Sequence, residues 1–107
     1  MSFEQQLMSN VTRVIDKTYS EVPCFQLVQE LLGDIPGPNS KVVSKDYIQV
    51  GDVVCFGTED GTWVSENTCL GVYLGNGKLI TTFKDWGVKL IPWRMAYKDF
   101  IWGLRRG

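Results

Sequence analysis

The spacing of apolar residues changes partway along this chain, and the change limits the folds that it can adopt. Apolar side chains in residues 3–18 recur at steps of three and four, the period of an amphipathic helix: Phe3, Leu7, Met8, Val11 and Ile15. From residue 47 onward, short segments rich in β-branched and aromatic residues are bounded by Gly, Asn or Asp, as is typical of strands and turns. Helices followed by strands predict an α+β fold, with N-terminal helices packed on one face of a small antiparallel sheet or barrel of about five strands.

A second helix is predicted to begin at Cys24. Pro23 disfavours helix in the residue before it and suits the start of a new one, while Gly33 is a natural stop. One apolar stripe runs between these two signals: Cys24, Leu27, Val28, Leu31 and Leu32. The unbonded N–H groups of a first helical turn favour an anion and lower a thiol pKa, so Cys24 is a candidate nucleophile.

The strands are expected in five segments: VGDVVCFG, NTCLGVYLG, KLITTF, GVKLIPW and FIWGLRR. Asn76-Gly77 gives the clearest local signal among them, because this pair readily adopts the positive φ angles of a two-residue hairpin turn. Strand therefore follows strand at this point, and the glycines of GVYLGNGK are not interpreted as a phosphate-binding loop.

Alternation divides the residues of NTCLGVYLG between two faces. One face carries Leu70, Val72 and Leu74, and the other carries Cys69, Gly71 and Tyr73. Glycine weakens a strand, so Gly71 predicts a close approach on its own face, most simply by a packed helix. If that helix is the second one, Cys24 and Cys69 are neighbours in space.

Size and charge exclude several classes of protein. A chain of 107 residues can build one hydrophobic core, so residues 1–107 are expected to form a single domain. The net charge of −1 provides no overall field that would recruit nucleic acid. The opening residues, MSFEQQLMSN, lack the pattern of a signal peptide, and no apolar run approaches the roughly 20 residues that span a bilayer. Neither a signal peptide nor a membrane span is expected.

Four segments together resemble the NlpC/P60 cysteine peptidases, a compact branch of the papain-like fold: PCFQLVQELL, VGDVVCF, CLGVYLGNGKLITT and GVKLIPW. Typical members carry Asp-Cys-Ser-Gly-Leu-Val, then Gly-Asp-Leu-Val, then His-Val-Gly-Ile-Tyr-Leu-Gly-Asn-Gly. The resemblance runs from about residue 19 to the end. Members of this family cleave peptide bonds in bacterial cell-wall stem peptides, and some are carried by bacteriophage tails.

The departures from the family pattern fall on the catalytic positions. Cys24 occupies the nucleophile position, Cys69 the position of the histidine base, and Thr81 the third polar position. The chain contains no histidine. Peptide hydrolysis by a thiol needs a base for the thiol and an acid for the leaving amine. An unperturbed thiol such as Cys69, with a pKa near ~8.5, is a poor substitute for an imidazole. Losing one member of such a unit typically costs on the order of a million-fold in rate.

The resemblance therefore implies a catalytically degenerate NlpC/P60-like domain with a structural or binding role. It implies phage tail or baseplate subunits as partners, residual binding of cell-wall peptides, and a location in the bacterial cytoplasm or the phage virion. Two alternatives stay open. One is an active thiol peptidase or amidase that uses Cys24 with an unconventional base. The other is a nucleic-acid-binding barrel, which the near-zero net charge disfavours.

The cysteines also have simpler interpretations. Cys24 heads an apolar stripe, so packing is favoured over chemistry, and Cys55 is expected in the core. A reversible disulfide between Cys24 and Cys69 would require Cα atoms within about 7 Å. The cysteines lack close-pair spacing and no histidine is present, so neither a metal site nor a cofactor is predicted.

Four tryptophans complete the candidate residues. Basic side chains are interleaved with the aromatic residues of the last quarter of the chain, a pattern that can bind a protein partner or stack nucleic-acid bases. Trp86 and Trp102 are expected in the core. Trp63 and Trp93 are expected on the surface as anchors for a partner.

Overall fold

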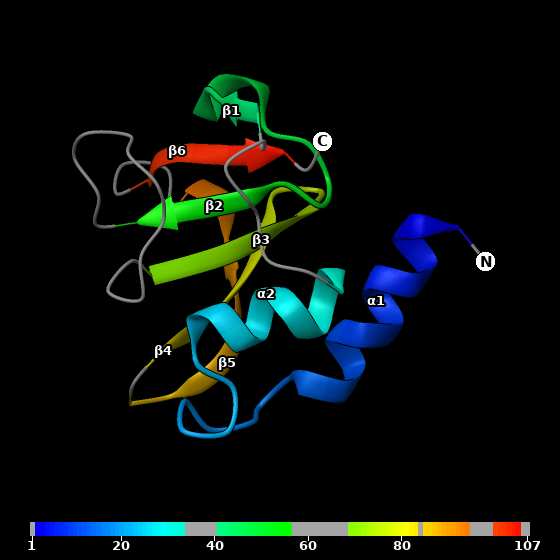
Figure 1. Ribbon diagram of the computed structural model, residues 1–107, viewed down its shortest axis with the longest axis vertical. Coiled ribbons are helices and arrows are strands. Elements are labelled where there is room, and N and C mark those ends of the chain that lie inside the picture. The colour runs from blue at the N-terminus through cyan, green and yellow to red at the C-terminus, as the bar shows by residue number, and fades with distance from the viewer. Residues whose placement is uncertain (1, 34–40, 57–68, 84, 95–99, 106–107) are drawn as a thin grey trace.

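The computed structural model describes residues 2–33, 41–56, 69–83, 85–94 and 100–105. Its helices are α1 (Phe3–Val14) and α2 (Cys24–Leu32), with a single 3-10 turn, η1 (Lys45–Tyr47). Its strands are β1 (Lys41–Val43), β2 (Val53–Phe56), β3 (Cys69–Gly75), β4 (Lys78–Phe83), β5 (Gly87–Pro92) and β6 (Phe100–Arg105) (Figure 1). The predicted α+β class is confirmed.

Helix α1 begins at the predicted place and ends earlier. Ser2 and Gln5 cap its start reciprocally, each side chain bonding the backbone N–H of the other. The helix ends at Val14 rather than near residue 18. Asp16 takes a positive φ of 66°, and its N–H then donates to the carbonyl of Val88 in β5. Pairing with the edge of the sheet therefore ends this helix.

Helix α2 agrees with its local signals. It runs from Cys24 to Leu32, directly after Pro23, and Gly33 closes it in the left-handed conformation at φ 87°. Glycine adopts this conformation without a Cβ penalty, which explains why the helix stops there. The side chain of Asn10 in α1 donates to the carbonyl of Leu31 and so ties the two helices together.

The described strands form one open antiparallel sheet in the order β1-β6-β2-β3-β4-β5. Strands β2 to β5 follow one another as a meander, and β6 then returns to lie between β2 and β1. The prediction of about five strands was therefore incomplete, because it omitted β1, which pairs with β6 at the edge of the sheet. The predicted hairpin between β3 and β4 is present, with φ of 52° at Asn76 and 72° at Gly77.

The two helices cover one face of the sheet (Figure 1). Their buried side chains share a core with residues from five strands: Val53, Cys55, Leu70, Val72, Ile80, Val88 and Leu104. The opposite face has a smaller cluster around Val54 and Leu79, packed by Ile48, Tyr73 and Trp93 among others. Neither described helix is long and apolar enough to cross a membrane.

Candidate functional site

Cys24 is the first residue of α2 and lies in the main core. Its side chain is 6% exposed and belongs to the cluster formed by both helices and the inner face of the sheet. Helix α2 packs on β3 and β4, so the cysteine-bearing helix does lie across the strand that contains Gly71. The predicted contact between these two elements is present, and the thiol is enclosed rather than open to a groove.

Gly71 is crowded on the face of the sheet away from the helices, whereas crowding by a helix was predicted. A Cβ placed on it would meet the carbonyl oxygen of Ile80 at 2.8 Å, and side-chain atoms of Leu79 and Thr81 at 3.2 Å. Leu79 belongs to the cluster on the face away from the helices. The close approach that Gly71 accommodates is therefore that of the neighbouring strand β4, while Leu70 and Val72 meet the helices. The expectation that a helix packs against Gly71 was wrong.

Thr81 lies beside Gly71, its partner in the β3–β4 register. Its hydroxyl is buried and donates to the carbonyl oxygen of Leu70 at 3.0 Å. Thr81 thus shares the face of Gly71 and Leu79, opposite the face that packs against Cys24. The structure does not bring the predicted third position together with the predicted nucleophile.

Cys69 is only partly described. Its backbone begins β3 and pairs with Phe56 of β2, and its side chain lies outside the described part of the structure. The predicted proximity of the Cys24 and Cys69 thiols, and the disulfide that it would permit, therefore stay predictions.

Cys55 is a core residue, as predicted. Its side chain is completely buried, and this burial raises its thiol pKa from an ordinary 9.0 to about 12. Removal from water disfavours the thiolate, which is the reactive form of a cysteine. Cys55 is therefore chemically inert in the folded protein.

The structure describes the side chains of two tryptophans, and Trp86 is more exposed than predicted. Trp86, expected in the core, is 69% exposed and contacts Phe83 with ring centroids 5.4 Å apart. Trp93, expected as a surface anchor, is half-buried against Tyr73 in an edge-on arrangement at 5.2 Å. The expectation for Trp86 was therefore wrong, whereas the anchor role of Trp93 stays a prediction. Trp63 and the side chain of Trp102 lie outside the described residues.

The sequence analysis missed the most structured polar site of the described chain. Asp52 is buried next to β2, and its carboxylate accepts two hydrogen bonds from the guanidinium of Arg105 at the end of β6. A signal was present in the sequence: an aspartate directly before the apolar run of β2 requires a cation or several donors once buried. The cation lies 53 positions away, so spacing alone could not identify it.

Two further findings concern metal binding and similarity to known proteins. Within the described segments, no group of three or more Cys, Asp or Glu side chains is placed to hold a metal ion. No protein-family model and no curated protein matches the chain.

Proposed function

We propose that the chain is a catalytically degenerate domain of NlpC/P60 type, a papain-like scaffold that serves as a structural or binding component. The resemblance of its motifs supports the kinship, and the packing of α2 on β3 is consistent with it. The main observation in favour of a loss of catalysis is the burial of Cys24. Its thiol is enclosed in an apolar core, in a chain that contains no histidine.

Two proton transfers are needed for peptide hydrolysis by a thiol, and this chain has no histidine to perform them. A thiol peptidase needs a group that takes the thiol proton and returns a proton to the leaving amine. Thr81 cannot orient such a group towards Cys24, because it lies on the other face of the sheet and donates to the Leu70 carbonyl. Cys24 begins α2 and is 6% exposed, so a substrate carbonyl has little access to its thiol.

Two measurements on the purified protein test this proposal. Isolated murein is incubated with the wild type and with Cys24→Ala, and released muropeptides are separated by chromatography. Iodoacetamide labelling at neutral pH is followed by peptide mapping, on native and on urea-unfolded protein. We expect no release of muropeptides, and labelling of Cys24 that is many-fold slower in the native state.

The opposite results would restore the enzyme. Muropeptide release that disappears in Cys24→Ala, together with rapid native labelling of Cys24, would establish a thiol peptidase with an unconventional base. Cys55→Ala is the matched control, because it removes a buried thiol that has no proposed role in catalysis. It should leave both measurements unchanged.

The setting in a bacteriophage tail or baseplate is part of the proposal and rests on the resemblance alone. It predicts that the protein co-purifies with assembled particles through a density gradient, in a fixed ratio to a tail subunit. Detection only among the free proteins of a lysate would contradict that setting, without affecting the proposed loss of catalysis.

A further inference from the structure

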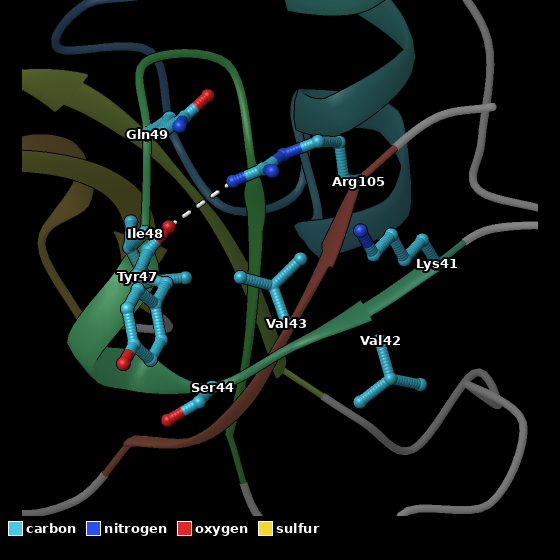
Figure 2. A pocket seen from close by; sticks show the side chains of 8 residues that line it. All are labelled: Lys41, Val42, Val43, Ser44, Tyr47, Ile48, Gln49 and Arg105. Carbon is cyan, nitrogen blue, oxygen red and sulfur yellow. Dashed lines mark hydrogen bonds between the residues drawn. The ribbon is translucent and has the colours of Figure 1, made fainter.

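A hollow of about 480 Å³ lies beside edge strand β1, on the side of the sheet away from Cys24. Strand β1, the residues that follow it and Arg105 of β6 form its walls (Figure 2). Ile48 is partly exposed and Val42 is 58% exposed, so these two provide apolar surface, and Tyr47 contributes a ring that is largely exposed. This volume is within the usual range for a site that binds a small ligand or a short peptide segment.

Arg105 is held in a fixed position at the wall of this hollow. Its Nε and Nη2 donate to the two carboxylate oxygens of Asp52 at 2.9 and 2.8 Å. Nη2 also donates to the carbonyl of Tyr47 at 3.1 Å, the bond drawn as a dashed line in Figure 2. Its Nη1 makes no hydrogen bond to another described residue, and the side chain remains 32% exposed. A guanidinium that is already oriented loses little conformational freedom when it binds an anion.

Lys41 stands directly opposite Arg105 in the β1–β6 register. Two like charges in directly opposed positions of an antiparallel pair destabilise a sheet. Asp52 balances Arg105, but Lys41 has no acidic partner in the described part of the chain. The three charged groups, Lys41, Arg105 and Asp52, therefore carry a net charge of +1 beside the hollow.

We infer that this hollow binds a carboxylate carried by a short peptide, with the carboxylate held between Lys41 and Arg105. A single negative charge balances the excess of the site, whereas a doubly charged phosphate would leave an uncompensated negative charge close to Asp52. The lysine ammonium and the remaining guanidinium N–H groups are strong donors for a carboxylate. The apolar surface of Val42 and Ile48 suits the side chain next to that carboxylate.

The position of the hollow favours a peptide over a free acid. Strand β1 is at the edge of the described sheet, where an extended segment can pair with its backbone. This inference is independent of the proposed loss of catalysis, because none of the residues that carry it takes part in that argument. Binding here and hydrolysis at Cys24 can each be present or absent without the other.

The test is an NMR titration of the ¹⁵N-labelled full chain. The probe is N-acetyl-valyl-leucine with a free carboxylate, compared with its C-terminal amide and with acetate at equal concentration. We expect the free acid to shift the amide signals of β1 and of residues 44–49, with saturation. The amide and acetate should produce much smaller shifts, because one lacks the charge and the other lacks the peptide.

Lys41→Met supplies the decisive variant. It removes the charge and keeps most of the side-chain length, and it should weaken binding of the free acid about tenfold. Lys78→Met is the matched control, since Lys78 is an exposed lysine of β4 outside this hollow. Lys41→Gln provides a second substitution if the methionine variant folds poorly.

Three results would overturn the inference. The first is equal binding of the acid and its amide, the second is equal binding by Lys41→Met and Lys78→Met, and the third is the absence of shifts around β1. Equal shifts with acetate would overturn the assignment to a peptide and leave an adventitious anion contact as the explanation.

Discussion

Arg105 and Asp52 form a two-point ion pair that joins the end of β6 to the residue before β2, at 2.9 Å from Nε to Oδ1 and 2.8 Å from Nη2 to Oδ2. The same carboxylate accepts a hydrogen bond from the backbone N–H of Gln49 at 2.8 Å. The hydrogen bonds from Arg105 to Asp52, together with the negative charge of Asp52, raise the pKa of Arg105. The pair fixes both the segment that carries η1 and the guanidinium that borders the hollow.

Asp52→Asn should lower the melting temperature by several degrees. The amide removes the charge and can no longer accept from all three donors, so the buried position loses hydrogen bonds that water cannot replace. Differential scanning calorimetry measures the change. Asp16→Asn is the control, because Asp16 pairs with Lys89 at the surface and is 69% exposed. Equal melting temperatures for the two variants would contradict this role of the pair.

Neighbouring threonines of β4 should respond oppositely to the same substitution. Thr82 is buried, and its hydroxyl has no hydrogen-bond partner among the described residues. Thr82→Val should therefore raise the free energy of unfolding by about 1 kcal/mol. Thr81→Val should lower it by about 1 kcal/mol, because it removes the bond to the Leu70 carbonyl. Urea unfolding measures both, and a loss of stability in Thr82→Val would show that its hydroxyl is satisfied.

Gly71→Ala should destabilise the protein by about 3 kcal/mol, since the added methyl would lie 2.8 Å from a backbone oxygen of β4 that cannot move freely. Gly33→Ala is the comparison, because its surroundings are open and only its φ of 87° opposes a side chain. That strain amounts to about 1 kcal/mol. Unfolding midpoints in urea distinguish the two costs. A smaller effect at Gly71 than at Gly33 would argue against the register between β3 and β4.

Cys55 should give the protein a pH dependence in alkaline solution. Its pKa is raised to about 12 by burial, so the folded state keeps the proton while the unfolded state loses it above about pH 9. The stabilisation is complete below about pH 9 and is lost as the pH rises towards about 12, by up to about 1.4 kcal/mol per pH unit.

The control for this titration is Cys55→Ala, which removes the thiol and with it this contribution. The free energy of unfolding of the wild type relative to Cys55→Ala, measured in urea from about pH 8 upward, should fall steadily as the pH rises. A constant difference across the range would mean that the folded state does not protect this thiol.

Local signals were sufficient for several elements. Pro23 and Gly33 bound α2 because each acts on its own backbone and the adjoining residues. Asn76 and Gly77 placed the β3–β4 hairpin for the same reason. Strands β2 to β6 were located by their composition, whereas β1 was missed because three residues cannot display a period.

Other features depended on partners far away in the sequence. Helix α1 continues in its apolar period beyond Val14, yet the backbone of residues 16–17 pairs with Val88 instead. The exposure of Trp86 and the partial burial of Trp93 were decided by the position of β5 relative to its neighbours. The ion pair between Asp52 and Arg105 needed the return of β6 beside β2.

By itself, the sequence determined the class of fold, the two helices, most strands and the absence of a histidine base. It also determined that Leu70 and Val72 lie on the opposite face from Gly71 and Tyr73, because a strand alternates whatever packs on it. Only the tertiary structure decided which of these faces the helices cover, since both carry enough apolar surface to be buried. Because the helices cover the face of Leu70 and Val72, Cys24 is enclosed and lies on the opposite face from Thr81. Lys41 and Arg105 lie opposite each other in the β1–β6 pair, at the edge of the sheet that begins with β1.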